Sequence, residues 1–385
     1  MSGMILLISA VALAAWVYLI GFHGGFWRSL PVLEAGTPSG DASVAVVVPA
    51  RNEAENIRQS IGSLAAQEYA GPLRIILVDD NSTDGTAEAA ASLGAGERVE
   101  IVKGATLPAG WSGKMWAVHQ GLAHEAARTS DYVLLTDADV AHAPDHVAAL
   151  VAKAEKDGLD LVSEMVRLHC VTAAERSLIP AFVFFFQMLY PFAWVADVRK
   201  RTAGAAGGTM LLRRAALDGV GGVERIRLRL IDDCALAKEI KRNGGRIWLG
   251  HSDVCRVDGV ARAESTRVYA RARDVWHMIA RTAYEQLHRS LLLLLGCVAG
   301  MALLYCVPPL MAVFAQGVPR VLGVAAWLLM AISFQPTLQR YDRLALWGVA
   351  LPGIAVFYVC ATVDSAVRHY SGRGGGWKDR VYSEG

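Results

Sequence analysis

The chain has 385 residues, 54% of them hydrophobic, and a mean hydropathy of +0.32. The apolar residues gather in long runs, which is typical of a protein partly embedded in lipid and excludes an ordinary soluble enzyme. A formal net charge of +2 without a basic cluster gives no case for nucleic-acid binding. The six cysteines show no C-x-x-C spacing, so the sequence predicts neither a zinc site nor a disulfide framework.

The first predicted element is a transmembrane anchor within residues 1–24. The run Met4–Phe22 carries no charge and approaches the roughly 20 residues that a bilayer-spanning helix needs. A cleaved signal peptide is the alternative, but no basic segment precedes the run, and Trp16, Tyr18 and Phe22 make a poor cleavage site. We therefore expect the anchor to be retained.

Residues 43–285 have the pattern of an α/β domain, in which short β-branched runs alternate with Ala-rich helical stretches. The strands we expect are Ser43–Val48, Leu73–Val78, Val99–Val102 and Tyr132–Leu135. This alternation predicts a mostly parallel sheet with helices on its faces. Ligands of such a sheet bind at the carboxyl ends of the strands, which is where the motifs below lie.

An aromatic-rich apolar run, residues 178–196, lies inside this domain. A full membrane crossing is implausible, because the motifs on either side of the run must meet on one side of the membrane. Two alternatives remain: a helix of the core, or a helix that lies in the membrane interface near an acceptor site.

After Arg289, apolar stretches predict two or three further membrane helices within residues 290–365, followed by a basic tail, 366–385. The stretches are Leu291–Phe314, Val321–Phe334, which is marginal in length, and Leu344–Thr362. The positive-inside rule would keep the basic domain, the Arg340/Arg343 link and the tail all cytoplasmic, which three full spans cannot satisfy. Either one stretch, such as the one broken by Pro308 and Pro309, is re-entrant or interfacial, or the tail is translocated.

Two strand ends carry polar groups suited to a nucleoside. The first strand ends at Pro49 and runs into Arg51 and Glu53, and the second is followed at once by Asp79 and Asp80. Carboxylates at a strand end can accept hydrogen bonds from a base or a ribose. Capping of the next helix is the alternative, and it does not explain the paired aspartates.

A third strand end carries Asp137-Ala138-Asp139. Alternate residues at the end of a strand face the same way, so both carboxylates can meet one divalent cation, Mn²⁺ or Mg²⁺. Such an ion neutralises a nucleotide diphosphate and makes it a viable leaving group. The alternative is a solvated acidic turn. His142 and His146 could also share a metal, but we expect them to belong to a helix that Pro144 starts.

Asp232 and Asp233 open a later helix with apolar residues in register behind them. Acids in a first helical turn are often only partners of the helix dipole. Glycosyl transfer with inversion, however, needs a carboxylate that takes the proton of the attacking hydroxyl. We assign this role to Asp233 and a positioning role to Asp232.

In this order the motifs resemble the inverting family 2 glycosyltransferases, over roughly Val44–Tyr284. The resemblance implies a nucleotide-diphospho-sugar transferase (GT-A-like) domain in which Asp137 and Asp139 bind the metal and the diphosphate, and Asp233 is the base. It also implies that the nucleoside is held by Pro49, Arg51, Glu53, Asp79 and Asp80. Lys114 is similar to the family's lysine near the donor, a surface lysine being the alternative, and Gly207-Gly208 is similar to the glycine-rich segment under the donor sugar.

Two departures refine the resemblance. Processive members carry a Q-x-x-R-W motif, whereas this chain has only Arg273-Asp274-Val275-Trp276 in that region, which favours transfer of a single sugar. Arg273 and Trp276 remain candidates for acceptor binding. The tail, residues 372–380, resembles the subgroup associated with hopanoid biosynthesis and its carotenoid-glycosylating relatives, which implies a polycyclic or polyisoprenoid acceptor.

We therefore expect a UDP- or GDP-sugar donor, a lipid acceptor and a location in a bacterial inner membrane with the catalytic domain cytoplasmic. One rival is a polyprenyl-phosphate glycosyltransferase, whose anionic acceptor needs no base. Another is a membrane scaffold that binds a nucleotide sugar without turnover.

Overall fold

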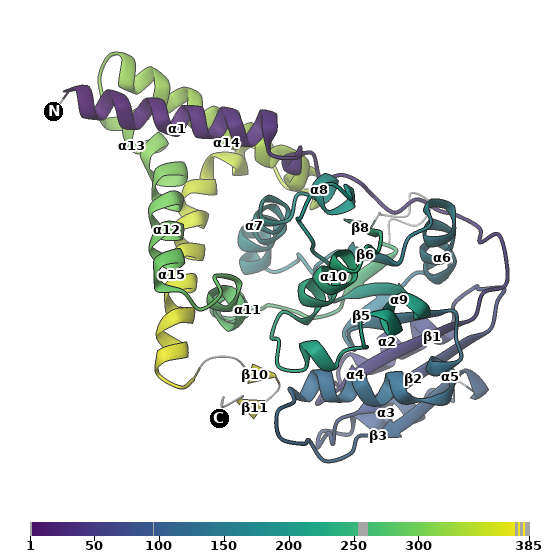
Figure 1. Ribbon diagram of the computed structural model, residues 1–385. Helices are drawn as coiled ribbons and strands as arrows, with labels where there is room; N and C mark the ends of the chain where they lie inside the picture. The colour runs from purple at the N-terminus through teal and green to yellow at the C-terminus, as the bar shows by residue number, and fades with distance from the viewer. Residues whose placement is uncertain (1, 95, 253–260, 374–375, 378–379, 382–385) are drawn as a thin grey trace.

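The computed structural model describes residues 2–94, 96–252, 261–373, 376–377 and 380–381. Figure 1 shows an α/β domain on one side of the molecule and a group of long helices, formed by both ends of the chain, on the other. Four tail residues on which the predicted resemblance rests lie outside the described residues; they are Gly374, Gly375, Lys378 and Asp379.

The domain is built on a seven-stranded sheet with the order β3-β2-β1-β4-β7-β6-β8. Its strands are β1 Val44–Ala50, β2 Leu73–Asp79, β3 Val99–Lys103, β4 Tyr132–Thr136, β6 Leu161–Met165, β7 Thr209–Arg213 and β8 Ile247–His251. Every pair is parallel except those of β7, which runs antiparallel to both β4 and β6. The mostly parallel sheet predicted from the sequence is confirmed, and the four predicted strands form one half of it.

Helices cover both faces of the sheet, because its central strands are apolar on both sides. On β1, Val44, Val46 and Val48 pack in one cluster, and Ala45 and Val47 pack in another. The first cluster includes side chains of α2 Ile57–Ala65, α3 Thr86–Ala91 and α6 His146–Asp157. The second includes side chains of α4 Gly113–Ala123, α7 Ala173–Leu189 and α10 Asp232–Arg242. The remaining short elements of the domain are α5 Glu125–Arg128, α8 Phe192–Ala196, α9 Arg214–Gly219, β5 Val140–His142 and β9 Ala263–Ser265.

Outside the domain, the long helices form two limbs in Figure 1. These helices are α1 Ser2–Phe22, α12 Leu291–Met301, α13 Val307–Phe314, α14 Val318–Arg340 and α15 Leu351–Tyr370. One limb contains α1, α13 and α14, and the other contains α12 and α15, which contacts α11 Ala272–Gln286. Five segments are long and apolar enough to cross a membrane: Gly3–Phe22, Ala173–Ala196, Leu291–Phe314, Val318–Arg340 and Ala345–Tyr370.

The expectation that the middle C-terminal stretch is marginal was wrong, since α14 has 23 residues. The sequence after Phe334 is polar enough to look like a link, but the helix continues because its polar side chains find partners. Gln187 donates to the Thr337 hydroxyl at 3.4 Å, and Gln335 donates to the Ala331 carbonyl at 2.8 Å. Polar groups that are satisfied in this way can remain inside an apolar helix.

Pro308 and Pro309 do not end the preceding helix. A π-helical turn, Ala302–Cys306, joins α12 to α13 just before them. Pro308 has no N–H, so it cannot donate to the carbonyl of Leu304, one turn earlier. The indole Nε1–H of Trp16, on α1, donates to that carbonyl instead at 2.8 Å. A bond from a neighbouring helix thus satisfies the backbone group that the proline leaves free.

The aromatic-rich run forms α7 and α8, and most of the side chains of α7 are buried. Phe184 packs against Phe26 and Phe334, and Phe185 packs against Tyr305 and Tyr358. These partners belong to the N-terminal segment and to the C-terminal helices. Helix α7 therefore lies between the sheet and the long helices and joins the two parts of the molecule.

We predict that Gly121→Ala destabilises the protein by about 1–3 kcal/mol, the range expected for overpacking. A Cβ at Gly121 would lie 2.4 Å from Val47 Cγ1 and 3.2 Å from Val78 Cγ2, so α4 could not keep its distance from the sheet. Gly62→Ala on α2 is the control, because its Cβ would meet nothing closer than 3.9 Å. Thermal unfolding in detergent should show a lower Tm for Gly121→Ala only, and equal Tm values would contradict the prediction.

Candidate active site

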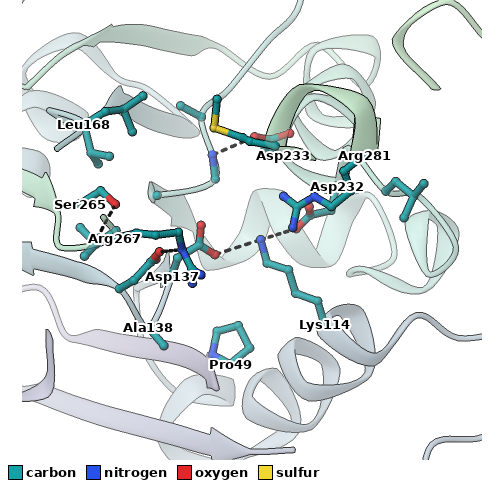
Figure 2. Close-up of a pocket in the computed structure, with 18 of the residues that line it drawn as sticks. Pro49, Lys114, Asp137, Ala138, Leu168, Asp232, Asp233, Ser265, Arg267 and Arg281 are labelled. Carbon is teal, nitrogen blue, oxygen red and sulfur yellow. Dashed lines mark hydrogen bonds and ion pairs between the residues drawn. The ribbon is translucent and has the colours of Figure 1, made fainter. Parts of the chain in front are cut away.

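A cavity of about 490 Å³ opens at the carboxyl ends of β1 and β4. Most of the predicted site residues border it, and Figure 2 shows several of them pointing toward one another across it. The predicted residues that line it are Pro49, Glu53, Lys114, Asp137, Asp139, Gly207, Gly208, Asp232 and Asp233. The cavity therefore gathers motifs that lie up to 184 positions apart in the chain, from Pro49 to Asp233.

Lys114 joins two of these motifs. Ser112 caps α4 by accepting a hydrogen bond from the Met115 N–H, which fixes the first turn that carries Lys114. The Lys114 Nζ lies 3.0 Å from Asp137 Oδ1 and 3.3 Å from Asp232 Oδ2 (Figure 2). Burial lowers the pKa of Lys114, but the neighbouring carboxylates outweigh burial and raise the pKa above its ordinary value. Lys114 is therefore a permanent positive charge in the cavity.

Asp233 lies in the first turn of α10, and both of its carboxylate oxygens accept backbone hydrogen bonds. Oδ2 accepts from the Gly207 N–H at 2.8 Å, and Oδ1 accepts from the Cys234 N–H at 2.6 Å. Burial raises the pKa of Asp233 to about 6, with a further contribution from the charge of Asp232. A carboxyl group that titrates near neutrality is suited to general-base work.

Asp139 is held by Arg267, a residue that the sequence analysis missed. The Arg267 Nε donates to Asp139 Oδ2, and its Nη2 donates to Glu53 Oε1 at 2.6 Å. Burial raises the pKa of Asp139, while the charge of Arg267 opposes this shift. Arg267 follows β9 as a single arginine outside any motif, so only the pairing of β9 with β5 reveals its place.

The donor set suits a divalent cation that also binds a substrate. Asp137 and Asp139 supply carboxylate oxygens, which Mg²⁺ and Mn²⁺ accept, and Mg²⁺ is commonly held by one or two carboxylates together with phosphates. Within the described residues, no group of three or more His, Cys, Asp or Glu side chains could hold a metal. The two aspartates would hold the ion, and a bound diphosphate would complete its ligands.

His142 and His146 do not form a metal site, because their rings bind each other. His142 Nδ1 lies 2.8 Å from His146 Nδ1, and both side chains are buried. His146 begins α6, as expected for the helix after Pro144. His142 instead ends β5, because Val140–His142 pairs with β9.

The apolar part of the cavity lining is formed by other elements. Phe182 and Phe186 of α7 and Met278 of α11 belong to it. Three basic side chains also border the cavity, namely Arg229, His277 and Arg281. The sequence analysis did not single out these residues, because they lie at unremarkable positions on helices and in a loop.

Five predicted residues do not line the cavity. Arg51 donates to the Asp80 carbonyl at 2.6 Å, and Asp79 ends β2 beside the end of β1, so these three residues lie behind the cavity at the neighbouring strand ends. Arg273 is exposed, and Trp276 donates its indole N–H to Asp364 of α15 at 2.7 Å. The structure thus does not bring Arg273 and Trp276 to the cavity.

Comparisons with known proteins agree with this architecture. Residues 45–221 match the family model described as glycosyl transferase family 2, so this part of the chain is a glycosyltransferase family 2 domain. The chain is 37% identical over 98 residues to the 4,4'-diaponeurosporenoate glycosyltransferase of Staphylococcus aureus strain bovine RF122 / ET3-1, which covers 26% of this chain and 24% of that protein. The protein of the same name from strain MRSA252 is 34% identical over 117 residues, 30% of this chain and 29% of its own length. The matches thus span 24–29% of the length of these relatives.

Among solved structures, the mannosyltransferase PcManGT from Pyrobaculum calidifontis, in complex with GDP-Man and Mn²⁺, is similar over 95% of this chain and 99% of its own. The TM-score is 0.56 and the sequence identity is 20%, so the likeness concerns the fold alone.

We predict that the Asp233 carboxyl titrates near pH 6, about two pH units above an ordinary aspartate. Because this pKa is raised in the folded state, the favourable contribution of the protonated group is complete below pH 4 and is lost as pH rises through 6. Asp232→Asn removes a like charge and should lower the midpoint, whereas Asp232→Glu should leave it in place. Carboxyl ¹³C NMR of labelled aspartates, assigned with Asp233→Asn, measures the midpoint; a value near 4 in the parent protein would refute the prediction.

Proposed function

We infer that the family 2 glycosyltransferase domain of this chain transfers a single sugar from a UDP- or GDP-sugar to a lipid, with a divalent cation and with inversion. The observation that supports this most is that the lining of the cavity is of two chemical kinds. Lys114 and the carboxylates suit a nucleotide diphosphate and its cation. Phe182, Phe186 and Met278 suit a hydrocarbon chain.

The elements that carry the apolar lining residues support a membrane position for the acceptor. Helix α7 contacts α14 and α15, and α11 contacts α15, so these elements adjoin segments long enough to cross a membrane. A lipid acceptor would then reach the cavity from the bilayer. The bound acceptor would exclude water from the cavity and so limit hydrolysis of the donor. We place the domain on the cytoplasmic side of a bacterial inner membrane, in keeping with its basic links.

In the proposed reaction, the acceptor hydroxyl oxygen forms a bond to the anomeric carbon while the bond from that carbon to the diphosphate oxygen breaks. Asp233 takes the hydroxyl proton, and the charge of Lys114 stabilises the departing diphosphate beside Asp137. A divalent cation held by Asp137 and Asp139 would supply further neutralisation of the diphosphate. Asp232 positions Lys114 by pairing with its ammonium group.

For the acceptor we propose an isoprenoid lipid. The tail resemblance supports a hopanoid, and the relatives named diaponeurosporenoate glycosyltransferases support a carotenoid-like compound. A polyprenyl phosphate is a second candidate, because Arg229, His277 and Arg281 could neutralise an anionic head group at the cavity. An acceptor of that kind would need no general base.

Asp139→Ala should abolish sugar transfer, with a loss of at least about 100-fold, the scale of losing one electrostatic stabiliser of the transition state. Membranes that contain the full chain would be incubated with Mn²⁺ and labelled UDP-sugars or GDP-mannose, and the organic-solvent extract would be counted. Asp41→Ala is the control, because this exposed aspartate precedes β1, at the opposite end of the strand from the cavity. No label from any donor would overturn lipid glycosylation and leave the scaffold alternative.

Asp233→Asn separates the two acceptor classes. With a hydroxyl acceptor, loss of the base should lower kcat by about 10²–10⁴-fold. With a phosphate acceptor, kcat should survive. Asp274→Asn serves as the control, since this residue also borders the cavity but lies on α11, away from the motif that holds Asp233. Sugar transfer to a soluble, short-chain isoprenol and to the matching isoprenyl phosphate would be compared in both variants.

A further inference from the structure

Behind the cavity, four buried side chains form a hydrogen-bonded chain that the proposed reaction does not use. Thr136 ends β4, His142 ends β5, His146 begins α6 and Glu164 lies in β6. Their exposed fractions are 2%, 4%, 0% and 0%, respectively. This hydrogen-bonded chain of side chains therefore connects four separate elements in the buried interior of the protein.

The contacts are continuous from one end to the other. The Thr136 hydroxyl donates to the Gly208 carbonyl at 2.8 Å, and His142 Nε2 lies 3.1 Å from the same hydroxyl oxygen. His142 Nδ1 lies 2.8 Å from His146 Nδ1, and His146 Nε2 contacts Glu164 Oε2. The two imidazole rings are stacked, with centroids 5.0 Å apart and planes inclined by 21°.

These contacts allow one direction of donation. The single proton of the Thr136 hydroxyl is used on Gly208, so His142 must donate from Nε2 to the hydroxyl oxygen. The other nitrogen of neutral His142 then has no proton and must accept from His146 Nδ1–H. One proton remains for the contact between His146 Nε2 and Glu164, whichever of the two holds it. Burial lowers the pKa of His142 well below its ordinary value, which keeps that ring neutral as this direction requires.

The Thr136 end of this hydrogen-bonded chain leads to two residues of the proposed reaction. Thr136 immediately precedes Asp137 in the chain. Gly208 follows Gly207, whose N–H donates to Asp233 Oδ2 at 2.8 Å. The glycine segment has little room to shift, because a Cβ at Gly208 would lie 2.9 Å from Val166 Cγ1. One buried chain of hydrogen bonds thus ties the turn that carries Asp137 to the segment that holds Asp233.

We propose that Glu164, His146, His142 and Thr136 are positioning residues that fix the Asp137–Asp139 turn relative to Asp233. The proposal rests on the proposed function for the roles of those aspartates. Outer partners of this kind orient the groups that touch a metal or a substrate, and their removal commonly costs 10–100-fold in affinity or activity. A network that only stabilised the fold would lower the free energy of unfolding and leave nucleotide binding unchanged.

The first test uses Thr136, with matched variants of the full chain in detergent. Thr136→Val keeps the shape and removes the hydroxyl, whereas Thr136→Ser keeps the hydroxyl. We expect Thr136→Val to weaken the binding of UDP or GDP in the presence of Mn²⁺ by about 10-fold, measured by calorimetry, and Thr136→Ser to stay near the parent value. Hydrogen exchange at the Gly207–Gly208 segment should become faster in Thr136→Val alone.

The second test uses Glu164, at the other end of the hydrogen-bonded chain, which does not line the cavity. Glu164→Leu removes the partner of His146, whereas the amide N–H of Glu164→Gln can donate to His146 Nε2 and keeps the direction of donation. We expect Glu164→Leu to weaken nucleotide binding and Glu164→Gln to retain it. If Thr136 and Glu164 act through one hydrogen-bonded chain, the double variant Thr136→Val with Glu164→Leu should weaken nucleotide binding no more than the more damaging single variant does. The effects of linked residues are not additive.

The outcomes are distinct. Parent-like exchange and parent-like affinity in folded Thr136→Val and Glu164→Leu would overturn the proposal. If Glu164→Leu does not fold, Glu164→Gln decides, since weak binding in that folded variant contradicts the assigned direction. If the parent protein binds neither UDP nor GDP with Mn²⁺ while Thr136→Val still accelerates exchange, the proposed function fails and the bracing of the glycine segment stands.

Discussion

Repulsion between carboxylates is the constraint on which the site depends. Six acidic side chains border one cavity: Glu53, Asp137, Asp139, Asp232, Asp233 and Asp274. Two like charges about 4 Å apart near a protein surface repel by roughly 4 kcal/mol, so the site needs cations. Lys114 pairs with Asp137 and Asp232, and Arg267 pairs with Asp139 and Glu53. Asp233 is held by two backbone N–H donors instead, and burial together with the charge of Asp232 raises its pKa to about 6.

The antiparallel direction of strand β7 brings the glycine segment to the acidic side chains. Because β7 runs antiparallel to β4 and β6, its beginning lies beside the end of β4, with Thr136 opposite Thr209. The glycine segment before β7 therefore arrives at the edge where the acids gather, and Gly207 can donate to Asp233. An all-parallel sheet would place the beginning of that strand at the opposite edge. The same reversal brings Gly208 within reach of Thr136, on which the buried hydrogen-bonded chain depends.

The sequence predicted the parts of this arrangement that depend on local patterns. Apolar runs followed at once by acids predicted β2 and β4, an apolar run that ends in proline and a polar turn predicted β1, and the charge-free run predicted α1. The strands β6, β7 and β8 were not predicted, because their pairing is set by contacts distant in the chain. Arg267 and the buried hydrogen-bonded chain carried no motif, since a lone arginine or a buried histidine acquires its role only through packing. The length of α14 was underestimated because the sequence does not show the partners of its polar residues, such as Gln187 of α7, which contacts Thr337.

The link between the sheet and the long helices has the same physical basis as the site, namely polar groups that must be satisfied when buried. Gln187 of α7 has partners on both sides. Its Oε1 accepts from His251 Nε2 at 3.1 Å, and its Nε2 donates to the Thr337 hydroxyl of α14 at 3.4 Å. At the end of α14, Arg340 donates to the carbonyls of Ser29 and Ser252 at 2.9 and 3.2 Å. Moving α14 away from β8 would leave these groups unpaired in the interior, at about 1–3 kcal/mol for each one, and more for a charged group. The contacts therefore hold α14 against the domain, together with α7, which supplies Phe182 and Phe186 to the apolar lining of the cavity.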